Sequence, residues 1–411
     1  MANNRDVYKR SLALLALIAA MPTDAANVEI TAKFSPDSAS PQKNTFINTT
    51  PVSGYCLSFA AVCQRLNMFS IRLPLVTRSI TSMQPGMGAR DNAMFQVPAN
   101  WRQLYVTNAA TGGSERVEVR ITGIGSRYVL SRPVTELTGE PNADVGHRRL
   151  WGLGWVNAPA PCATSGLASY GASTYTFFWL TRVEESCVKT ARFLIPSMYY
   201  QYLDFAYELR TPNPLAMGVG NYTGHLRYSL GPHGDFDFGD VMRPDETELI
   251  LNFNLTVEHT LKVEIPPGAR LIQLEPEGGW QVWLHQGRKP GRLFRDQTVN
   301  LWASSQFKMT LECAEPLGNT CSMRNEAGHQ VPLDVAVSLP PGLSDASGRP
   351  VNRLPLRLDG SGTELFQPSI YVDRKPSTLH FEIKADAVKQ MLERPGSTYT
   401  GTATVVWDSE V

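Results

Sequence analysis

The best spacing for a metal site lies in an acidic segment, Asp235-Phe-Asp237-Phe-Gly239-Asp240, with Glu246 at the twelfth position. A calcium loop of the EF-hand type has Asp or Asn at position five and Gly at position six, whereas here Gly239 precedes Asp240. Pro244 also interrupts the loop, and no helical pattern flanks it. We therefore interpret the segment as a solvated acidic turn, and we expect no metal and no other cofactor.

Catalytic motifs are absent from the sequence. It contains no HExxH, no GxSxG, no P-loop and no GxGxxG after a strand, and its seven histidines are scattered. A glycoside hydrolase would need two carboxylates about 5–10 Å apart across a cleft, and no spacing here indicates such a pair. We predict that the protein is not an enzyme.

Ligand recognition is a second kind of chemistry that the side chains suggest. His147-Arg148-Arg149 falls in a polar segment, residues 137–149, which we interpret as a loop, and loops are where binding residues concentrate. Arg148 and Arg149 are candidates for contact with an acidic glycan, and Trp151 is a candidate for stacking on a sugar. The alternatives are solvated surface charge for the arginines and core packing for the tryptophan.

Length and composition set the frame for these residues. The chain has 411 residues, enough for two domains, and its 38 basic and 38 acidic residues balance. A general nucleic-acid binder would show a basic excess, so we expect no nucleic-acid partner. The 29 prolines and 32 glycines, with many short apolar runs, favour an all-β architecture.

The first 25 residues have the pattern of a secretory signal peptide. Arg5, Lys9 and Arg10 precede an apolar run from Ser11 to Met21, and small residues follow at Thr23 and Ala25. The run is about half the ~20 apolar residues that a membrane-spanning helix needs. We expect an exported protein.

Export gives the six cysteines a structural role. An even number in an exported chain indicates disulfides, and six cysteines allow 15 connectivities. The simplest connectivity joins sequence neighbours, each bond closing a short loop: Cys56–Cys63, Cys162–Cys187 and Cys313–Cys321.

Period-two alternation predicts strands through the first half of the chain. The candidates are residues 28–34, 68–76, 116–130, 174–183 and 203–209. We find no long amphipathic helix in this half, and the spacing of strands and turns fits a β-sandwich.

A long alternating stretch, Leu249 to Ile265, marks the middle of the chain. One strand of that length would span roughly 55 Å, well beyond ordinary strands. We predict two strands in series with a short link near Glu258-His259, the first ending one domain and the second beginning the next. The alternative is one long bent strand or hairpin within a single domain.

The second half has the size of one immunoglobulin-like sandwich. Its predicted strands are residues 281–284, 297–301, 308–311, 333–339 and 378–383. The segment from Asp386 to Arg394 predicts a short helix that stops at Pro395-Gly396.

The same short pattern closes both halves. Tyr399-Thr-Gly401 precedes an alternating strand in which Ala403, Val405 and Trp407 share one face, and Tyr222-Thr-Gly224 precedes a similar strand. We interpret the pair as two domains of similar build. The last strand would have an uncovered outer edge, and we expect the sandwich that contains Tyr222 to be complete.

The chain resembles the CblD-like pilus biogenesis initiators, the tip subunits of CS1/CFA-I-type (alternate chaperone pathway) fimbriae. The resemblance lies in the signal peptide, two tandem β-domains, and the stretch Leu255-Thr-Val-Glu-His-Thr-Leu-Lys-Val-Glu-Ile265 followed by residues 269–279. The Tyr-Thr-Gly motif with its alternating terminal strand resembles the C-terminal strand of the family.

The resemblance implies two tandem immunoglobulin-like β-sandwich domains, an adhesin domain at residues 26–257 and a pilin domain at residues 258–411. It implies that the pilin sandwich is incomplete. A periplasmic chaperone would lend a strand to the groove beside Ala403, Val405 and Trp407, and would hold the carboxylate of Val411. A donor strand from the major pilin subunit would later replace the chaperone at the outer-membrane usher.

Taken together, we predict a fimbrial tip subunit at the bacterial cell surface that initiates assembly and binds a host glycan or glycoprotein receptor. The adjacent arginines that family adhesins use after the closing strand are replaced here by Gly231-Pro232-His233, and Arg227 lies nearby as a further candidate. The alternatives are a structural minor pilin without a receptor, or a secreted carbohydrate-active enzyme.

Overall fold

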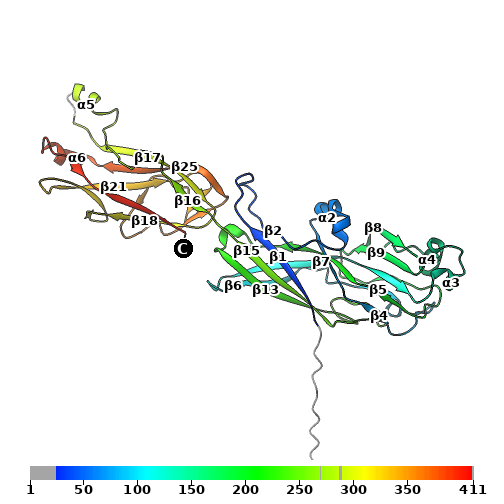
Figure 1. Ribbon diagram of the computed structural model, residues 1–411. Helices are drawn as coiled ribbons and strands as arrows, with labels where there is room; N and C mark the ends of the chain where they lie inside the picture. The colour runs from blue at the N-terminus through cyan, green and yellow to red at the C-terminus, as the bar shows by residue number, and fades with distance from the viewer. Residues whose placement is uncertain (1–24, 269, 287–288, 410–411) are drawn as a thin grey trace, which may run out of the picture.

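A computed structural model describes residues 25–268, 270–286 and 289–409. The predicted signal peptide, residues 1–25, lies outside these ranges apart from Ala25, which is the first residue of strand β1. The molecule is all-β with short helices, as the composition predicts, and Figure 1 shows two halves end to end. No helix in the described ranges is long and apolar enough to cross a membrane.

The N-terminal half contains the first fifteen strands. They are β1 (Ala25–Phe34), β2 (Ile47–Asn48), β3 (Phe69–Leu73), β4 (Thr77–Ser79), β5 (Ala93–Phe95), β6 (Arg102–Asn108), β7 (Ser114–Leu130), β8 (Ala163–Tyr170), β9 (Thr174–Leu180), β10 (Cys187–Lys189), β11 (Met198–Tyr200), β12 (Leu203–Arg210), β13 (Gly220–Ser229), β14 (Met242–Pro244) and β15 (Glu248–Val257).

Most of these strands form one 13-stranded sheet with the order β14-β4-β11-β7-β6-β13-β15-β1-β2, to which β3, β8, β9 and β12 are attached. The long strand β7 pairs with β6, β9, β11 and β12 in turn. β1 is parallel to β15 over all ten of its residues, from Ala25 opposite Glu248 to Phe34 opposite Val257.

Short helices join these strands: α1 (Tyr55–Ser58), α2 (Ala60–Leu66), α3 (Val134–Thr138) and α4 (Ala143–Trp151), with 3₁₀ turns at Ala89–Asp91 and Pro214–Ala216. The loop predicted at residues 137–149 is therefore wrong, because α4 occupies most of it. The Asn142 side chain caps α4 by accepting the N–H of Val145 at 3.0 Å. His147, Leu150 and Trp151 are buried at the i, i+3, i+4 spacing of a helix face.

The C-terminal half contains the remaining elements. They are β16 (Leu261–Glu264), α5 (Trp280–Gln286), β17 (Leu293–Ala303), β18 (Lys308–Cys313), β19 (Pro316–Leu317), β20 (Thr320–Asn325), β21 (Gln330–Ser338), β22 (Leu343–Asp345), β23 (Leu354–Leu356), β24 (Phe366–Pro368), β25 (Val372–Ile383), α6 (Ala385–Leu392), β26 (Tyr399–Thr400) and β27 (Ala403–Asp408).

Two sequence predictions for this half have different outcomes. The helix predicted from Asp386 to Arg394 is confirmed as α6. The strand predicted at residues 281–284 is wrong, because the segment lies in helix α5. Gly278 and Gly279 have positive φ angles of 77° and 80°, which turn the chain just before the helix, and four alternating residues were too few to separate strand from helix.

Each half has its own main hydrophobic core, and a smaller buried cluster around the Cys56–Cys63 disulfide adds to the N-terminal half. The main core of the N-terminal half extends from Val28 to Val257 and that of the C-terminal half from Leu293 to Tyr399. β15 ends at Val257 and β16 begins at Leu261, so the prediction of two strands in series near Glu258-His259 is confirmed.

His259 fixes this junction by contacts to both halves. Its Nε2 is 2.8 Å from the carbonyl oxygen of Met217, and its Nδ1 is 3.2 Å from the hydroxyl of Ser304. Its ring also packs edge-on against Phe34, with centroids 5.6 Å apart. Burial lowers the pKa of His259, which favours the neutral ring at this junction.

The structure contains the three predicted disulfides, Cys56–Cys63, Cys162–Cys187 and Cys313–Cys321. The first anchors α2 to α1. The third joins β18 to β20, beside the last strand of the chain.

Candidate functional site

The last strand, β27, pairs with β18 along its whole length, from Ala403 opposite Cys313 to Asp408 opposite Lys308. Ala403, Val405 and Trp407 pack against the C-terminal core, as the alternation predicts, but all three stay only partly buried. The Trp407 ring lies 5.7 Å from that of Phe307. The core is therefore thinly covered at this strand.

The other edge of β27 has no strand partner among the described residues. Its counterpart in the N-terminal half is β13, which pairs with β6 on one side and with β15 on the other. β15 runs antiparallel to β13 and buries every second side chain: Leu249, Leu251, Phe253, Leu255 and Val257. The described part of the C-terminal half has no strand in the place that β15 fills.

An apolar groove lies next to this uncovered region. It consists of two cavities of about 260 and 610 Å³ that share Leu271, Ile272, Leu274 and Met323. The smaller cavity reaches Gly401, Thr402 and Ala403 at the start of β27, and the larger one extends along α6. We call these two cavities the C-terminal groove.

Apolar side chains around the C-terminal groove are exposed to solvent. Leu271 is 91% exposed, and Trp280 and Leu392 are each 37% exposed. Water contact with apolar surface costs about 25 cal/mol per Å², so a ligand that covers these side chains gains free energy. Contiguous exposed apolar surface of this kind is typical of protein interaction sites.

The Tyr-Thr-Gly motif brings strands unusually close in both halves. A Cβ atom on Gly401 would lie 2.4 Å from the carbonyl oxygen of Ser322, and one on Gly224 would lie 2.3 Å from that of Tyr105. Both motif tyrosines are buried, and the Tyr222 hydroxyl donates to the carbonyl oxygen of Gly218 at 3.1 Å. The motif recurs because both strands need a residue without a side chain at this crossing.

The candidate receptor-binding arginines of α4 lie on the surface of the N-terminal half. Arg148 pairs with Asp144 one turn earlier, and Arg149 pairs with Glu140 at 3.4 Å. Together with Arg192 they line an open cavity of about 710 Å³. Two of the three guanidinium groups therefore already have carboxylate partners.

Trp151 does not share this exposure. It is 4% exposed and packs in the N-terminal core, with its ring 5.1 Å from that of Trp155, so the suggestion that it stacks on a sugar is wrong. His147 is also buried, with its Nδ1 2.6 Å from the Tyr128 hydroxyl and its Nε2 2.8 Å from the carbonyl oxygen of Gly171. Burial lowers the pKa of His147.

Arg227 lies on β13 and does not line the α4 cavity. It pairs with Glu248 of the adjacent strand at 3.2 Å, and its side chain is largely exposed. The structure thus brings Arg148 and Arg149 together and leaves Arg227 apart from them.

The carboxylates of the acidic segment have protein partners. Arg90 binds Asp237 at 2.8 Å and Asp240 at 2.9 Å, and Asp235 accepts hydrogen bonds from Ser229. This arrangement joins the turn to the rest of the N-terminal half. No group of three or more metal-ligating side chains occurs among the residues that the structure describes.

A polar row crosses three strands of the C-terminal half, and sequence reasoning missed it. The Ser338 hydroxyl is 2.8 Å from His380 Nε2, and His380 Nδ1 is 2.7 Å from Asp296. This order matches a serine-hydrolase triad, but the Ser338 oxygen accepts the N–H of Arg353 at 2.9 Å, and Arg353 also pairs with Asp296. We interpret the row as cross-strand hydrogen bonding that fixes register. No sequence signal marks it, since its members come from three different strands.

Val411, the predicted carboxylate contact of a chaperone, lies outside the described residues.

No protein-family model and no curated protein matches the sequence. Solved structures do match. The Escherichia coli CFA/I adhesin CfaE is 10% identical, covers 93% of this chain and 92% of its own, and gives a TM-score of 0.23. A chain of a CFA/I chaperone–tip adhesin complex is also 10% identical, and the match covers 94% of this chain and 97% of that one, with a TM-score of 0.23.

A third match is the CsuC–CsuE chaperone–tip complex of archaic Csu pili from Acinetobacter baumannii. It is 11% identical, covers 93% of this chain and 98% of its own, and gives a TM-score of 0.21. These three matches are structures of a fimbrial adhesin and of chaperone–tip complexes.

Proposed function

We propose that the chain is the tip subunit of a chaperone–usher fimbria, with an adhesin domain at residues 26–257 and a pilin domain at residues 258–411. One observation carries this proposal: among the described residues β27 is paired on one side only, next to an open apolar groove, while its counterpart β13 is paired on both sides. The pilin domain accepts a strand from another protein at this place. The two separate cores support the division into domains.

The adhesin domain provides a template for the missing strand. β15 is antiparallel to β13, and its inward side chains are all apolar. By the same geometry, the donor strand runs antiparallel to β27 and directs alternate apolar side chains into the C-terminal groove. Backbone hydrogen bonds to β27 give affinity, and the alternating side chains set the register.

A subunit of this kind accepts a strand without donating one. β1, the first described strand, is paired with β15 over all of its ten residues, so it is part of the adhesin sheet. Such a subunit occupies the fimbrial tip and is the one with which assembly starts.

The same groove explains the proposed assembly partners. Before assembly, a periplasmic chaperone covers β27 and the groove, and holds the Val411 carboxylate. At the outer-membrane usher, a strand of the major pilin replaces the chaperone. The protein is thereby exported to the bacterial surface, where the adhesin domain binds a host glycan or glycoprotein.

Complementation of the full mature chain tests this function. We expect the protein to aggregate when it is expressed in the periplasm without a chaperone, and to become soluble and monomeric with a peptide of alternating apolar residues from the major pilin N-terminus. Ile272→Asp should weaken peptide binding at least tenfold because it places a charge in the groove.

The matched control is Ile47→Asp, at an isoleucine of β2 that is 59% exposed and remote from the groove. It should leave peptide binding unchanged. A stable soluble monomer in the absence of both chaperone and peptide would refute strand acceptance. Cell-binding assays with the complemented protein separate an adhesin from a structural minor pilin.

A further inference from the structure

The exposed apolar surface next to the C-terminal groove extends beyond the groove itself. Trp280 lines the larger cavity, whereas Leu284, four residues later in α5, lines neither cavity. Residues four apart lie on the same face of a helix, so the face that begins at the groove with Trp280 continues outward to Leu284. Leu284 is 72% exposed and Val282 is 40% exposed. A strand seated in the groove would leave both of these side chains in contact with water.

Contacts at its base hold α5 in this exposed position. The backbones of Glu275 and Phe294 form a pair of hydrogen bonds, at 2.9 and 3.2 Å. The indole nitrogen of Trp283 donates to the carbonyl oxygen of Glu277 at 3.0 Å, which fastens the helix to the segment that precedes it. The helix therefore presents its apolar side chains from a defined position.

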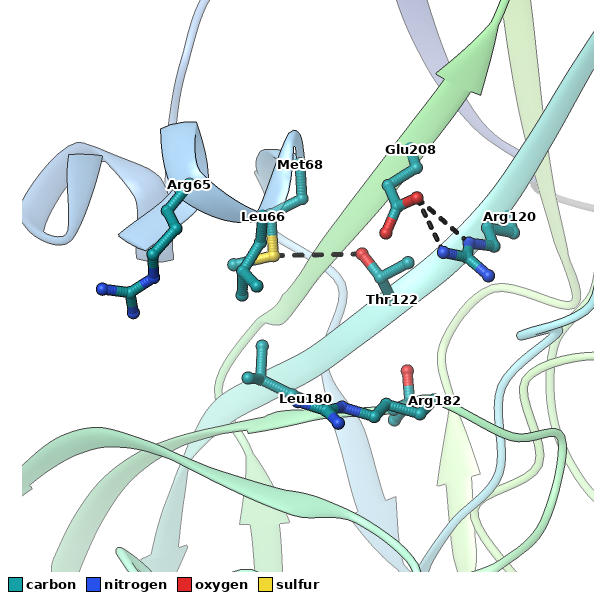
Figure 2. Close-up of a pocket in the computed structure, with 9 residues that line it drawn as sticks. Arg65, Leu66, Met68, Arg120, Thr122, Leu180, Arg182 and Glu208 are labelled. Atoms are coloured by element: carbon teal, nitrogen blue, oxygen red, sulfur yellow. Dashed lines mark hydrogen bonds and ion pairs between the residues drawn. The ribbon is translucent and has the colours of Figure 1, made fainter. Parts of the chain in front are cut away.

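Apolar side chains at a cavity of the N-terminal half are arranged differently. In the cavity of about 440 Å³ beside α2, Leu66 and Leu180 are partly buried and Met68 is buried (Figure 2). Arg120 and Glu208, which line the same cavity, pair with each other at 2.8 Å. The chain itself thus covers much of this apolar surface, whereas it leaves that of α5 exposed.

The direction of β27 determines where a donor subunit lies. β27 runs from Ala403, which lines the smaller cavity, to Asp408, so a donor strand antiparallel to it ends opposite Ala403. In the proposed function the donor strand is the N-terminal segment of its own subunit, and the folded domain of that subunit follows directly after the strand. That domain therefore lies at the Ala403 end of β27.

The opposite end of β27 lies near the junction with the N-terminal half. Asp408 is opposite Lys308 of β18, and Ser304, four residues before Lys308, contacts His259 of the junction. Figure 1 shows α5 and α6 at the end of the C-terminal half that is remote from the N-terminal half. A donor subunit that follows its strand out of the groove thus meets the end at which α5 projects.

We infer that the apolar face of α5 binds the folded domain of the subunit that donates the strand. The strand fills the C-terminal groove, and an apolar patch of the domain that follows it covers Val282 and Leu284. Because the two contacts are linked through one chain, the second forms at a high effective concentration and tightens the first. The inference rests on the proposed function and adds a second surface to the same assembly step.

Competition for the full mature chain, kept soluble by a fluorescent donor peptide, tests this contact. The competitors are the unlabelled donor peptide, the whole major pilin with its own groove closed by a fused donor strand, and the donor peptide followed by an unrelated folded domain of similar size. We expect the pilin to bind at least tenfold more tightly than the peptide. The fusion with the unrelated domain should bind like the peptide.

Leu284→Asp should weaken pilin binding at least tenfold and leave peptide binding unchanged, because Leu284 does not line the groove. Leu284→Gln should weaken pilin binding at least threefold. Glutamine has nearly the helix propensity of leucine, so this variant separates loss of the apolar side chain from loss of the helix. The matched control is Leu57→Asp, at a leucine of α1 that is 71% exposed, and it should change neither binding.

Equal binding of the pilin and the peptide would overturn the inference, as would equal weakening of both by Leu284→Asp. If Leu284→Asp leaves pilin binding unchanged and instead prevents co-purification with the periplasmic chaperone, α5 contacts the chaperone and the inference is wrong. Absence of peptide binding would refute strand acceptance itself, so failure of this inference and failure of the proposed function are distinguishable.

Discussion

Replacing Gly401 by alanine should destabilise the C-terminal half selectively. Gly401 connects β26 to β27, and a Cβ atom there would lie 2.4 Å from the Ser322 carbonyl oxygen and 3.3 Å from Met323 Cα. Both nearby atoms belong to the backbone of β20, so no side chain can rotate away. The strands must separate by somewhat less than 1 Å to restore an ordinary contact.

The size of the effect follows from this geometry. Forcing one extra carbon into a packed site typically costs 1–3 kcal/mol, and a backbone obstacle places Gly401→Ala in the upper part of that range, at about 2 kcal/mol. For a unit of about 150 residues, this corresponds to a fall of ~4–8 °C in the melting temperature. Gly224→Ala should act in the same way on the N-terminal half, since its Cβ would lie 2.3 Å from the Tyr105 carbonyl oxygen.

Differential scanning calorimetry of the complemented chain measures both effects, provided that the halves melt separately, as their two cores indicate. Gly291→Ala is the control, because a Cβ at Gly291 would meet nothing within 4 Å, and it should change stability by less than about 0.5 kcal/mol. If Gly401→Ala melts like this control, the close approach of the strands, and with it our account of the Tyr-Thr-Gly motif, is wrong.

Three further predictions concern other parts of the molecule. Replacing Cys313 and Cys321 by serine opens a loop with a sequence separation of 8, which should cost about 2.5 kcal/mol and lower only the C-terminal melting transition. Burial raises the pKa of Asp204 from 3.8 to about 6, so the folded protein binds the proton more tightly and the stability of the N-terminal half should fall as the pH rises from 4 to 6. Asp204→Asn should remove up to about 3 kcal/mol of this change in unfolding free energy, whereas the control Asp386→Asn, at an exposed residue, should not. If both variants show the same slope of unfolding free energy against pH, Asp204 is not the group responsible. His259→Ala removes the contacts to Met217 and Ser304, and small-angle scattering should then show a broader range of end-to-end dimensions; an unchanged profile would mean that other contacts fix the junction.

Alternating strands were the part of the fold that sequence reasoning predicted well. The segment from Leu249 to Ile265 forms the two predicted strands with the predicted link between them. In β21, the alternating residues Leu333, Val335 and Val337 are the buried ones, as predicted. The period of a strand is local, and a buried face imposes it directly on the sequence.

The helices were harder to predict, because their signals were short and mixed with charge. In α4, the arginines at 148 and 149 obscured the buried face formed by His147, Leu150 and Trp151. In α5, four residues fit either period. In α4, packing of this buried face against the N-terminal core accompanies the helix.

The candidate sites depend on pairings that no local pattern contains. The alternation of β27 indicated a strand with an uncovered edge. It did not indicate the C-terminal groove, because Leu271 and Met391 line that groove from segments distant in the sequence. Such contacts depend on the register of strands far apart in the chain.

Amide hydrogen exchange at β27 tests the central claim most directly. In an antiparallel pair, alternate N–H groups of β27 point away from β18 and exchange freely while that edge is open. A donor peptide of alternating apolar residues should slow the exchange of these outward amides at least a hundredfold, and a scrambled peptide of the same composition should not. Unchanged exchange with the alternating peptide, or equal protection with the scrambled one, would contradict strand acceptance at this edge.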